Sequence, residues 1–465
     1  MKSRVFRILS YVILTTFVLT PGRGMGVGAE RQAVQPATLQ APAAPTLGTT
    51  TRVSVASDGT EGNDWSHNPS ISADGRFVAF HSAAVNLVSD DTNGYWDIFV
   101  HDRQTGETTR VSVASDGSQG NWSSAYPTIS ADGRYVAFDS YADNLVSGDT
   151  NSTGDVFVHD RQTGQTARVS IASDGSQGTS SSESSSISAD GRYVSFHTDA
   201  DNLVSGDTND SDDVFVHDRQ TGTITRVSVA SDGGQGDHNS WSASISGDGF
   251  FVAFVSDATN LVNGDTNSES DIFVHDRQTG ETTLVSVASD GTQENSSSRY
   301  PSLSADGRYV VFDSGADNLV SGDTNSALDV FVHDRLTGET TRVSVASDGT
   351  QGNSSSSYPS ISADGRFVAF ESWADNLVNG DTNGTGDVFV HDRLTGLTER
   401  VSFTSGGIQV NFNSWSPSIT SNGGSVAFAS YAPNLVPNDT NNVTDIFVHE
   451  RGMDGTTEVF LPIIQ

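Results

Sequence analysis

The chain has 465 residues and a formal net charge of −34 at pH 7, from 58 acidic and 24 basic residues. A chain this acidic repels nucleic acid and anionic lipid surfaces, so neither is expected as a partner. It has no cysteine, which excludes disulfides and thiol chemistry and leaves packing as the main source of stability.

The first 29 residues differ from the rest of the chain. Three basic residues precede an apolar run over 8–19, and the small residues 27–29 offer a cleavage site. This pattern predicts a signal peptide over residues 1–29, because the run is shorter than the roughly 20 apolar residues of a membrane span. Residues 30–50, rich in Ala, Pro and Thr, predict a disordered linker. We therefore expect a secreted or extracytoplasmic protein with no membrane insertion after cleavage.

After the linker, one sequence of 58 residues is repeated seven times. Its clearest marker is a His-Asp-Arg triplet, which becomes His-Glu-Arg in the last copy. The triplets begin at His101, His159, His217, His275, His333, His391 and His449. A strict period of this length is typical of a solenoid, propeller or array, in which each unit buries its apolar face against its neighbours.

The second copy shows the elements of one unit. Strands are expected at 126–130, 135–138, 155–159 and 166–171, with tight turns at 131–134 and 161–164. Four short strands joined as a meander form a propeller blade. A parallel β-helix, the main alternative, lacks two hairpin turns per repeat.

The predicted fold is therefore all-β, a seven-bladed β-propeller of four-stranded antiparallel blades over residues 51–465. The repeats begin near 52, 110, 168, 226, 284, 342 and 400, and a degenerate strand near 458 is a candidate closing strand. One terminal strand must complete the blade begun by the other terminus, which hides the free edges. The repeat spacing leaves open which terminus does so.

Two segments of the sixth copy resemble a known family. Ser360–Phe370 contains an Asp-Gly turn between two strands, and Asp387–Asp392 reads Asp-Val-Phe-Val-His-Asp. These segments resemble the WD-like repeats of TolB-type propellers. The resemblance implies the propeller fold and an exported bacterial protein. No Trp-Ser-Pro precedes an Asp-Gly turn here, as it does in that family's pattern, and the family's amino-terminal domain is not expected. Propellers host both binders and enzymes.

Every copy contains the sequence Asp-Thr-Asn-x-x-x-Asp in a long loop. Oxygen donors at positions 1, 3 and 7 resemble the opening of a calcium loop, whereas turn capping by Asp and Asn is the alternative. The candidate calcium ligands are Asp91, Asn93, Asp97, Asp149, Asn151, Asp155, Asp207, Asn209, Asp213, Asp265, Asn267, Asp271, Asp323, Asn325, Asp329, Asp381, Asn383, Asp387, Asp439, Asn441 and Asp445. Calcium is the one candidate cofactor.

In a meander, both tight turns lie on one face of the ring and both longer loops on the other; we call these the tight-turn face and the long-loop face. The long loops vary between copies and carry the aromatic residues, as a recognition face would. The alternative is that these aromatics pack beneath the loops. The candidate ligand contacts are Trp65, Trp122, Tyr126, Trp241, Tyr300, Tyr358 and Trp415.

Two further patterns predict scaffold rather than chemistry. The position after the second strand is ionisable in five copies, at His81, Asp139, His197, Asp313 and Glu371. With strands about 4.8 Å apart, these side chains lie too far from one another to form one site. The repeated triplet is expected to be structural, with its Asp capping the following turn and its Arg pairing with carboxylates, because an active site needs one copy of its residues.

No Gly-x-Ser-x-Gly or His-Glu-x-x-His motif occurs, so the sequence predicts a non-catalytic protein, not an enzyme. The expected function is binding or scaffolding by a monomer that recognises a protein or glycan ligand on the long-loop face. A metal-dependent propeller hydrolase or lactonase with its site at the axial mouth is the leading alternative. A TolB-like cell-envelope component is the second.

Overall fold

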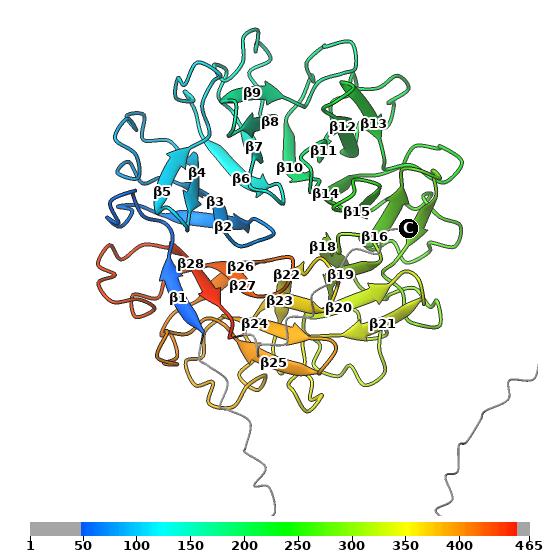
Figure 1. The fold of residues 1–465 in the computed structure, drawn as a ribbon. Helices are drawn as coiled ribbons and strands as arrows, with labels where there is room; N and C mark the ends of the chain where they lie inside the picture. The colour runs from blue at the N-terminus through cyan, green and yellow to red at the C-terminus, as the bar shows by residue number, and fades with distance from the viewer. Residues whose placement is uncertain (1–47, 453–465) are drawn as a thin grey trace, which may run out of the picture. The chain divides into compact units, whose positions relative to one another are not determined.

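The computed structural model describes residues 48–452, which form seven four-stranded antiparallel sheets around a central axis (Figure 1). The predicted seven-bladed propeller is confirmed. The expected signal peptide, most of the expected linker and the candidate closing strand near 458 lie outside the described residues. Within 48–452, no helix is long and apolar enough to cross a membrane.

The strands of each blade are ordered from the axis outward. The innermost strands are β2 (Ser66–Ile71), β6 (Ser124–Ile129), β10 (Ser182–Ile187), β14 (Ser240–Ile245), β18 (Ser298–Leu303), β22 (Ser356–Ile361) and β26 (Ser414–Ile419). The second strands are β3 (Phe77–Ser82), β7 (Tyr135–Ser140), β11 (Tyr193–Thr198), β15 (Phe251–Ser256), β19 (Tyr309–Ser314), β23 (Phe367–Ser372) and β27 (Ser425–Ser430). The third strands are β4 (Asp97–Asp102), β8 (Asp155–Asp160), β12 (Asp213–Asp218), β16 (Asp271–Asp276), β20 (Asp329–Asp334), β24 (Asp387–Asp392) and β28 (Asp445–Glu450). The outermost strands are β5 (Glu107–Arg110), β9 (Gln165–Arg168), β13 (Thr223–Arg226), β17 (Thr282–Leu284), β21 (Glu339–Arg342), β25 (Leu397–Arg400) and β1 (Thr49–Arg52).

The hydrophobic core lies between the blades, because each sheet packs face to face on its neighbours. In the first blade, Phe80 of β3 is paired with Phe99 of β4, and their ring centroids are 6.0 Å apart. Both rings pack against Ile446 and Val448 of the seventh blade. Alternate residues of the same strands point to the second blade. The second and third strands are thus buried on both faces, which explains their nearly continuous apolar sequence.

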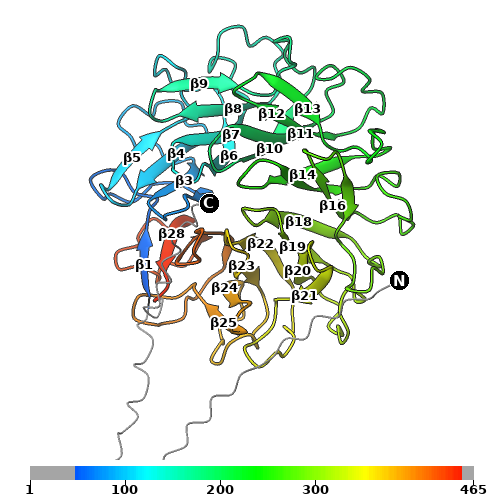
Figure 2. The same cartoon turned by 45° about the vertical axis from the view of Figure 1, so that its right-hand side comes forward.

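The amino-terminal strand closes the ring. Strand β1 pairs antiparallel with β28, from Thr49 opposite Glu450 to Arg52 opposite Phe447, so it is the outermost strand of the seventh blade (Figures 1 and 2). It begins two residues before the expected start of the propeller at residue 51. Thr49 and Thr50 therefore belong to a strand and not to the expected linker.

The His-Asp-Arg triplet holds the tight-turn face together. Asp160 accepts a hydrogen bond from the backbone N–H of Gln162 and a bidentate pair from Arg134 at 2.9 and 2.7 Å. Among the triplet arginines, Arg103 and Arg451 make the expected carboxylate pairs, with Glu450 and Glu399, whereas the other five do not. Arg161 donates to the carbonyl of Gly133 and lies 4.4 Å from the ring centroid of Phe77 in the preceding blade. Its main role is to join blades by stacking.

Candidate ligand-binding site on the propeller axis

Each innermost strand contains a β-bulge that brings two residues toward the axis. In the first blade, the register with β3 shifts between His67 and Ser70. The first bulge residue of every blade has a positive φ of 49–56°, although none is glycine; these residues are Asn68, Tyr126, Ser184, Ser242, Tyr300, Tyr358 and Ser416. Such a backbone costs about 1–2 kcal/mol per residue and persists only where its surroundings impose it, often beside a ligand site.

The bulges line a cavity of 350 Å³ on the axis, to which every innermost strand contributes. Three tyrosines reach it, and the rest of the lining is mostly serine and proline. Tyr300 and Tyr358 stack with their centroids 4.1 Å apart, and their hydroxyl groups are 2.9 Å apart. Tyr126 and Tyr358 are 54% and 41% exposed, so each presents a ring to solvent.

The ionisable residues of the second strands hold these bulges from behind. Asp139 accepts a hydrogen bond from the backbone N–H of Ser184 at 2.8 Å, and Asp313 accepts one from Tyr358 at 3.2 Å. Glu371 and His81 accept in the same way from the bulges of the seventh and second blades. The sequence predicted no common site for these residues. The structure shows that four of them share one task, which is to anchor a strained bulge of the next blade.

Burial shifts the titration of these anchors. It raises the pKa of Asp139 and of Asp313 to about 7, and it lowers the pKa of His81 to about 3. The guanidinium of Arg299, 3.7 Å from Asp313, opposes the shift at that carboxyl. At neutral pH, the bulges are therefore supported by neutral imidazole and by carboxyl groups that are partly protonated.

Replacing Asp313 by asparagine is expected to stabilise the protein, increasingly so as the pH rises. Because the folded pKa of about 7 exceeds the ordinary value near 3.9, the folded state binds this proton more tightly, and ionisation destabilises it. The gain in the free energy of unfolding should grow from pH 5 to pH 7 and level off at about 2–4 kcal/mol. Urea unfolding across pH 5–9 measures it. Asp210→Asn, on an exposed loop, is the control, and equal pH profiles for both variants would contradict this role.

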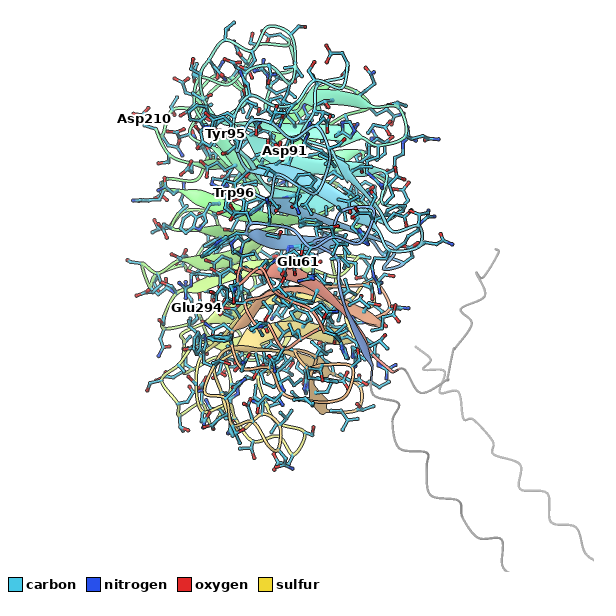
Figure 3. The ribbon with its side chains drawn as sticks, turned by 90° about the vertical axis from the view of Figure 1, so that its left-hand side faces the viewer. Glu61, Asp91, Tyr95, Trp96, Asp210 and Glu294 are labelled. Carbon is cyan, nitrogen blue, oxygen red and sulfur yellow. The ribbon has the colours of Figure 1, made fainter. Side chains whose placement is uncertain are left out.

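Several aromatic candidates meet near the mouth of the cavity in the first blade. The ring of His67 lies 5.6 Å from those of both Trp65 and Trp96, and 6.1 Å from that of Trp415. Figure 3 shows Trp96 beside Tyr95 toward one side of the ring. Tyr95 in turn stacks on Trp122 at 4.8 Å.

The seven sequence-predicted aromatics therefore fall into four groups. Tyr126, Tyr300 and Tyr358 line the cavity. Trp65 and Trp415 meet around His67, and Trp122 lies farther out on Tyr95. Trp241 and Trp415 also pack against the cores between blades, as the alternative interpretation expected.

The Asp-Thr-Asn loops are held by arginine. In the second blade, Nη1 of Arg168 lies 3.1 Å from Asp149 and 3.0 Å from Asp155, and Asp155 also accepts a hydrogen bond from Ser170 at 2.5 Å. All seven final Asp residues of the motif are buried and receive such a serine bond. The arginine contact is repeated in five of the other six blades, by Arg52, Arg110, Arg226, Arg342 and Arg400. We call this arrangement the arginine clamp.

The candidate calcium ligands do not fit a calcium ion. The Asn oxygen already accepts a backbone N–H two residues later, as for Asn209 with Ser211, and the Asn amide donates to the next loop, as to the carbonyl of Gly236 at 2.9 Å. A guanidinium takes the cation's place between the Asp carboxylates. No group of three or more His, Cys, Asp or Glu side chains within residues 48–452 could hold a metal ion.

One clamp departs from the pattern. The fourth blade has Leu284 where the other blades have arginine, and Glu294 replaces a residue that is glycine in five other copies. Glu294 is 2% exposed and accepts hydrogen bonds from Ser298 and Ser314 (Figure 3). Burial and the charge of Asp271 raise the pKa of Glu294 well above its usual value. A retained proton thus relieves the charge that arginine relieves elsewhere.

Comparisons with known proteins support the fold. No protein-family model matches the chain, and no curated protein matches it by sequence. Among solved structures, it is similar to an oligogalacturonate lyase in complex with manganese, at 14% identity over 86% of this chain and 93% of that chain, with a TM-score of 0.51. It is also similar to prolyl endopeptidases, at 13% identity over 80% of this chain and 46% of theirs, with a TM-score of 0.50. TolB from Acinetobacter baumannii matches at 18% identity over 65% of this chain and 58% of its own, with a TM-score of 0.38.

These similarities correct the expectation of a non-catalytic protein. The propeller architecture seen here also occurs in a lyase and in endopeptidases. Near-identical blades and missing hydrolase motifs therefore do not exclude catalysis. The seven blades themselves confirm the propeller fold, and at these identities no family is shown.

Neither the bulges nor the exceptional clamp of the fourth blade was predicted from the sequence. A bulge has no residue signature here, because Asn, Tyr and Ser all occupy its positive-φ position. The exceptional clamp did have a signal. When the seven copies are aligned, Leu284 stands where the other six have arginine. Glu294, in the same alignment, stands where five copies have glycine and one has valine.

Proposed function

We propose that this protein is exported and binds an uncharged glycan, which enters the axial cavity from the long-loop face. The observation that carries the proposal is the cavity itself, in which Tyr126 and Tyr358 present exposed rings on bulges whose strain the surrounding residues maintain. Export is inferred from the signal peptide expected over residues 1–29.

The chemistry of the lining favours a neutral sugar. A pyranose ring presents an apolar C–H face, which suits an aromatic ring, and hydroxyl groups, which suit the hydroxyls of Ser184 and Ser416. No lysine or arginine lines the cavity, whereas Asp139, Asp313 and Glu371 lie directly behind it. An acidic polymer such as oligogalacturonate would meet repulsion here, so the substrate of the similar lyase is not carried over.

Replacing Tyr126 and Tyr358 together by serine is expected to weaken glycan binding about tenfold to a hundredfold, because two stacking rings are lost. Calorimetric titration of the full chain with soluble neutral oligosaccharides, namely cello-, chito- and xylo-hexaose, measures the change. The matched control is Leu394→Ser, which changes an exposed side chain on the opposite face. Binding that the double variant retains in full would contradict the proposal, as would failure of the native chain to bind any of the three.

Acid–base chemistry on the bound glycan is the second candidate function. Asp139 and Asp313 favour it, because each carboxyl lies directly behind a bulge that lines the cavity and keeps one oxygen without a hydrogen-bond partner. The pKa of about 7 of each carboxyl suits a general acid at neutral pH. Mass spectrometry of the titrated oligosaccharides tests it, because cleavage would appear as shorter chains. Products that persist in an Asp139→Asn, Asp313→Asn double variant would rule these carboxyls out.

A further inference from the structure

Within residues 48–452, the exposed aromatic side chains outside the axial cavity are confined to one part of the long-loop face. Six of them extend over four successive blades, the sixth, seventh, first and second, outside the axial cavity. We call them the aromatic arc: Trp65, Trp122, Tyr141, Trp373, Phe412 and Tyr431. Three of them lie one or two residues before an innermost strand. The other three lie one residue after a second strand.

The other three blades carry polar residues or glycine at the matching positions. Asp199, Asp257 and Gly315 follow the second strands of the third, fourth and fifth blades, where Tyr141 and Trp373 stand in the second and sixth. The long-loop face is thus divided into an aromatic part and a polar, partly acidic part. Core packing does not require this division, because the third and fourth blades form the same four-stranded sheets with aspartate after their second strands.

Two residues of the arc are arranged as stacking platforms. The ring of Tyr141 lies against Gly154, where a Cβ would come within 3.1 Å of the ring atoms, and the ring of Trp373 lies against Gly386 in the same way at 3.3 Å. The two side chains are 52% and 50% exposed, as expected of rings that are covered on one face and open on the other. The first blade has the small and large residues exchanged: Ala83 stands at the position of Tyr141, and Trp96 stands at the position of Gly154.

We propose that the aromatic arc binds an extended, uncharged polysaccharide, whose successive sugar rings lie on separate platforms. Flat rings spaced one or two to a blade match a repeating polymer better than a protein, which needs one contiguous apolar core. The rings are flanked by polar groups such as Asn121 and Asn413, and by acidic residues that disfavour an anionic polymer. The proposal rests on the ligand class of the proposed function and adds a second surface, so that the full ligand is longer than the axial cavity.

The test is retention of the full chain on insoluble cellulose, chitin and amylose, with polygalacturonate as the anionic comparison. Retention on at least one neutral polymer is expected, and Tyr141→Ala and Trp373→Ala should each weaken it about threefold to tenfold. The controls are Leu336→Ala and Leu394→Ala, which remove still more exposed apolar side chains from the tight-turn face and should change nothing. Thermal melting of each variant shows that it is folded.

Three results would overturn the proposal. They are no retention on any neutral polymer, equal losses in the arc and control variants, and binding of arrayed peptides that only the arc variants lose, which would indicate a protein partner. The outcome of this retention test can be distinguished from the outcome of the hexaose titration that tests the proposed function. Arc variants should keep their affinity for soluble hexaoses, whereas the Tyr126→Ser, Tyr358→Ser variant should lose that affinity and keep part of its retention on the polymer.

Discussion

Replacing Arg168 by leucine is expected to lower the free energy of unfolding by about 3–5 kcal/mol, the usual cost of removing one partner from a buried ion pair. The side chain of Arg168 is 9% exposed and lies between Asp149 and Asp155, which are 4% and 0% exposed. Without the guanidinium, two carboxylates close together are left out of water and must protonate or separate. The size of leucine is not the cause, since Leu284 occupies the same position in the fourth blade.

Arg134→Leu is the matched control for the clamp. It also removes an arginine bound to aspartate, but its side chain is 35% exposed and solvent screens the pair, so a clearly smaller loss than for Arg168→Leu is expected. Urea unfolding of both variants measures the difference. Adding Asp149→Asn to Arg168→Leu should restore part of the stability by removing one of the two like charges. Equal losses in the two single variants would show that the clamp is no stronger than a surface pair.

Replacing Gly191 by alanine is expected to cost about 2–4 kcal/mol, through backbone strain and a steric clash together. Gly191 has a φ of +72°, and an added Cβ would lie 2.1 Å from Cδ2 of Tyr135 in the preceding blade. The blades must separate locally, or the tyrosine ring must leave the stack that Arg219 makes on it at 4.3 Å.

Gly222→Ala separates the two contributions. Gly222 has the same φ of +72°, yet nothing lies within 4 Å of its added Cβ, so only the backbone strain of about 1 kcal/mol is expected. Thermal melting of the two variants side by side gives the cost of the collision as the difference between them. A loss at Gly191 no greater than that at Gly222 would mean that the interface between blades is easily deformed.

Much of the scaffold could be predicted because its contacts are local in the repeat. The pairing of Arg168 with Asp155 follows from the β8–β9 hairpin, in which Arg168 stands opposite Phe157 and so shares a face with Asp155. The same arginine contact accounts for which terminal strand closes the ring. Arg52 of β1 reaches Asp445, whereas the matching position at the carboxyl end is Glu458, which would add a third negative charge to Asp439 and Asp445. The clamp therefore explains why β1 takes this edge.

The sequence by itself determined the unit of this protein, the number of units and the contacts inside each unit, because a 58-residue period carries its strands, turns and charge pairs in fixed local register. Only the tertiary structure decided the binding surfaces. Tyr300 and Tyr358 are 58 residues apart, yet they stack at 4.1 Å because seven blades close around one axis. The bulges, the cavity and the aromatic arc depend on how neighbouring blades face one another, and that arrangement arises from ring closure rather than from any one repeat.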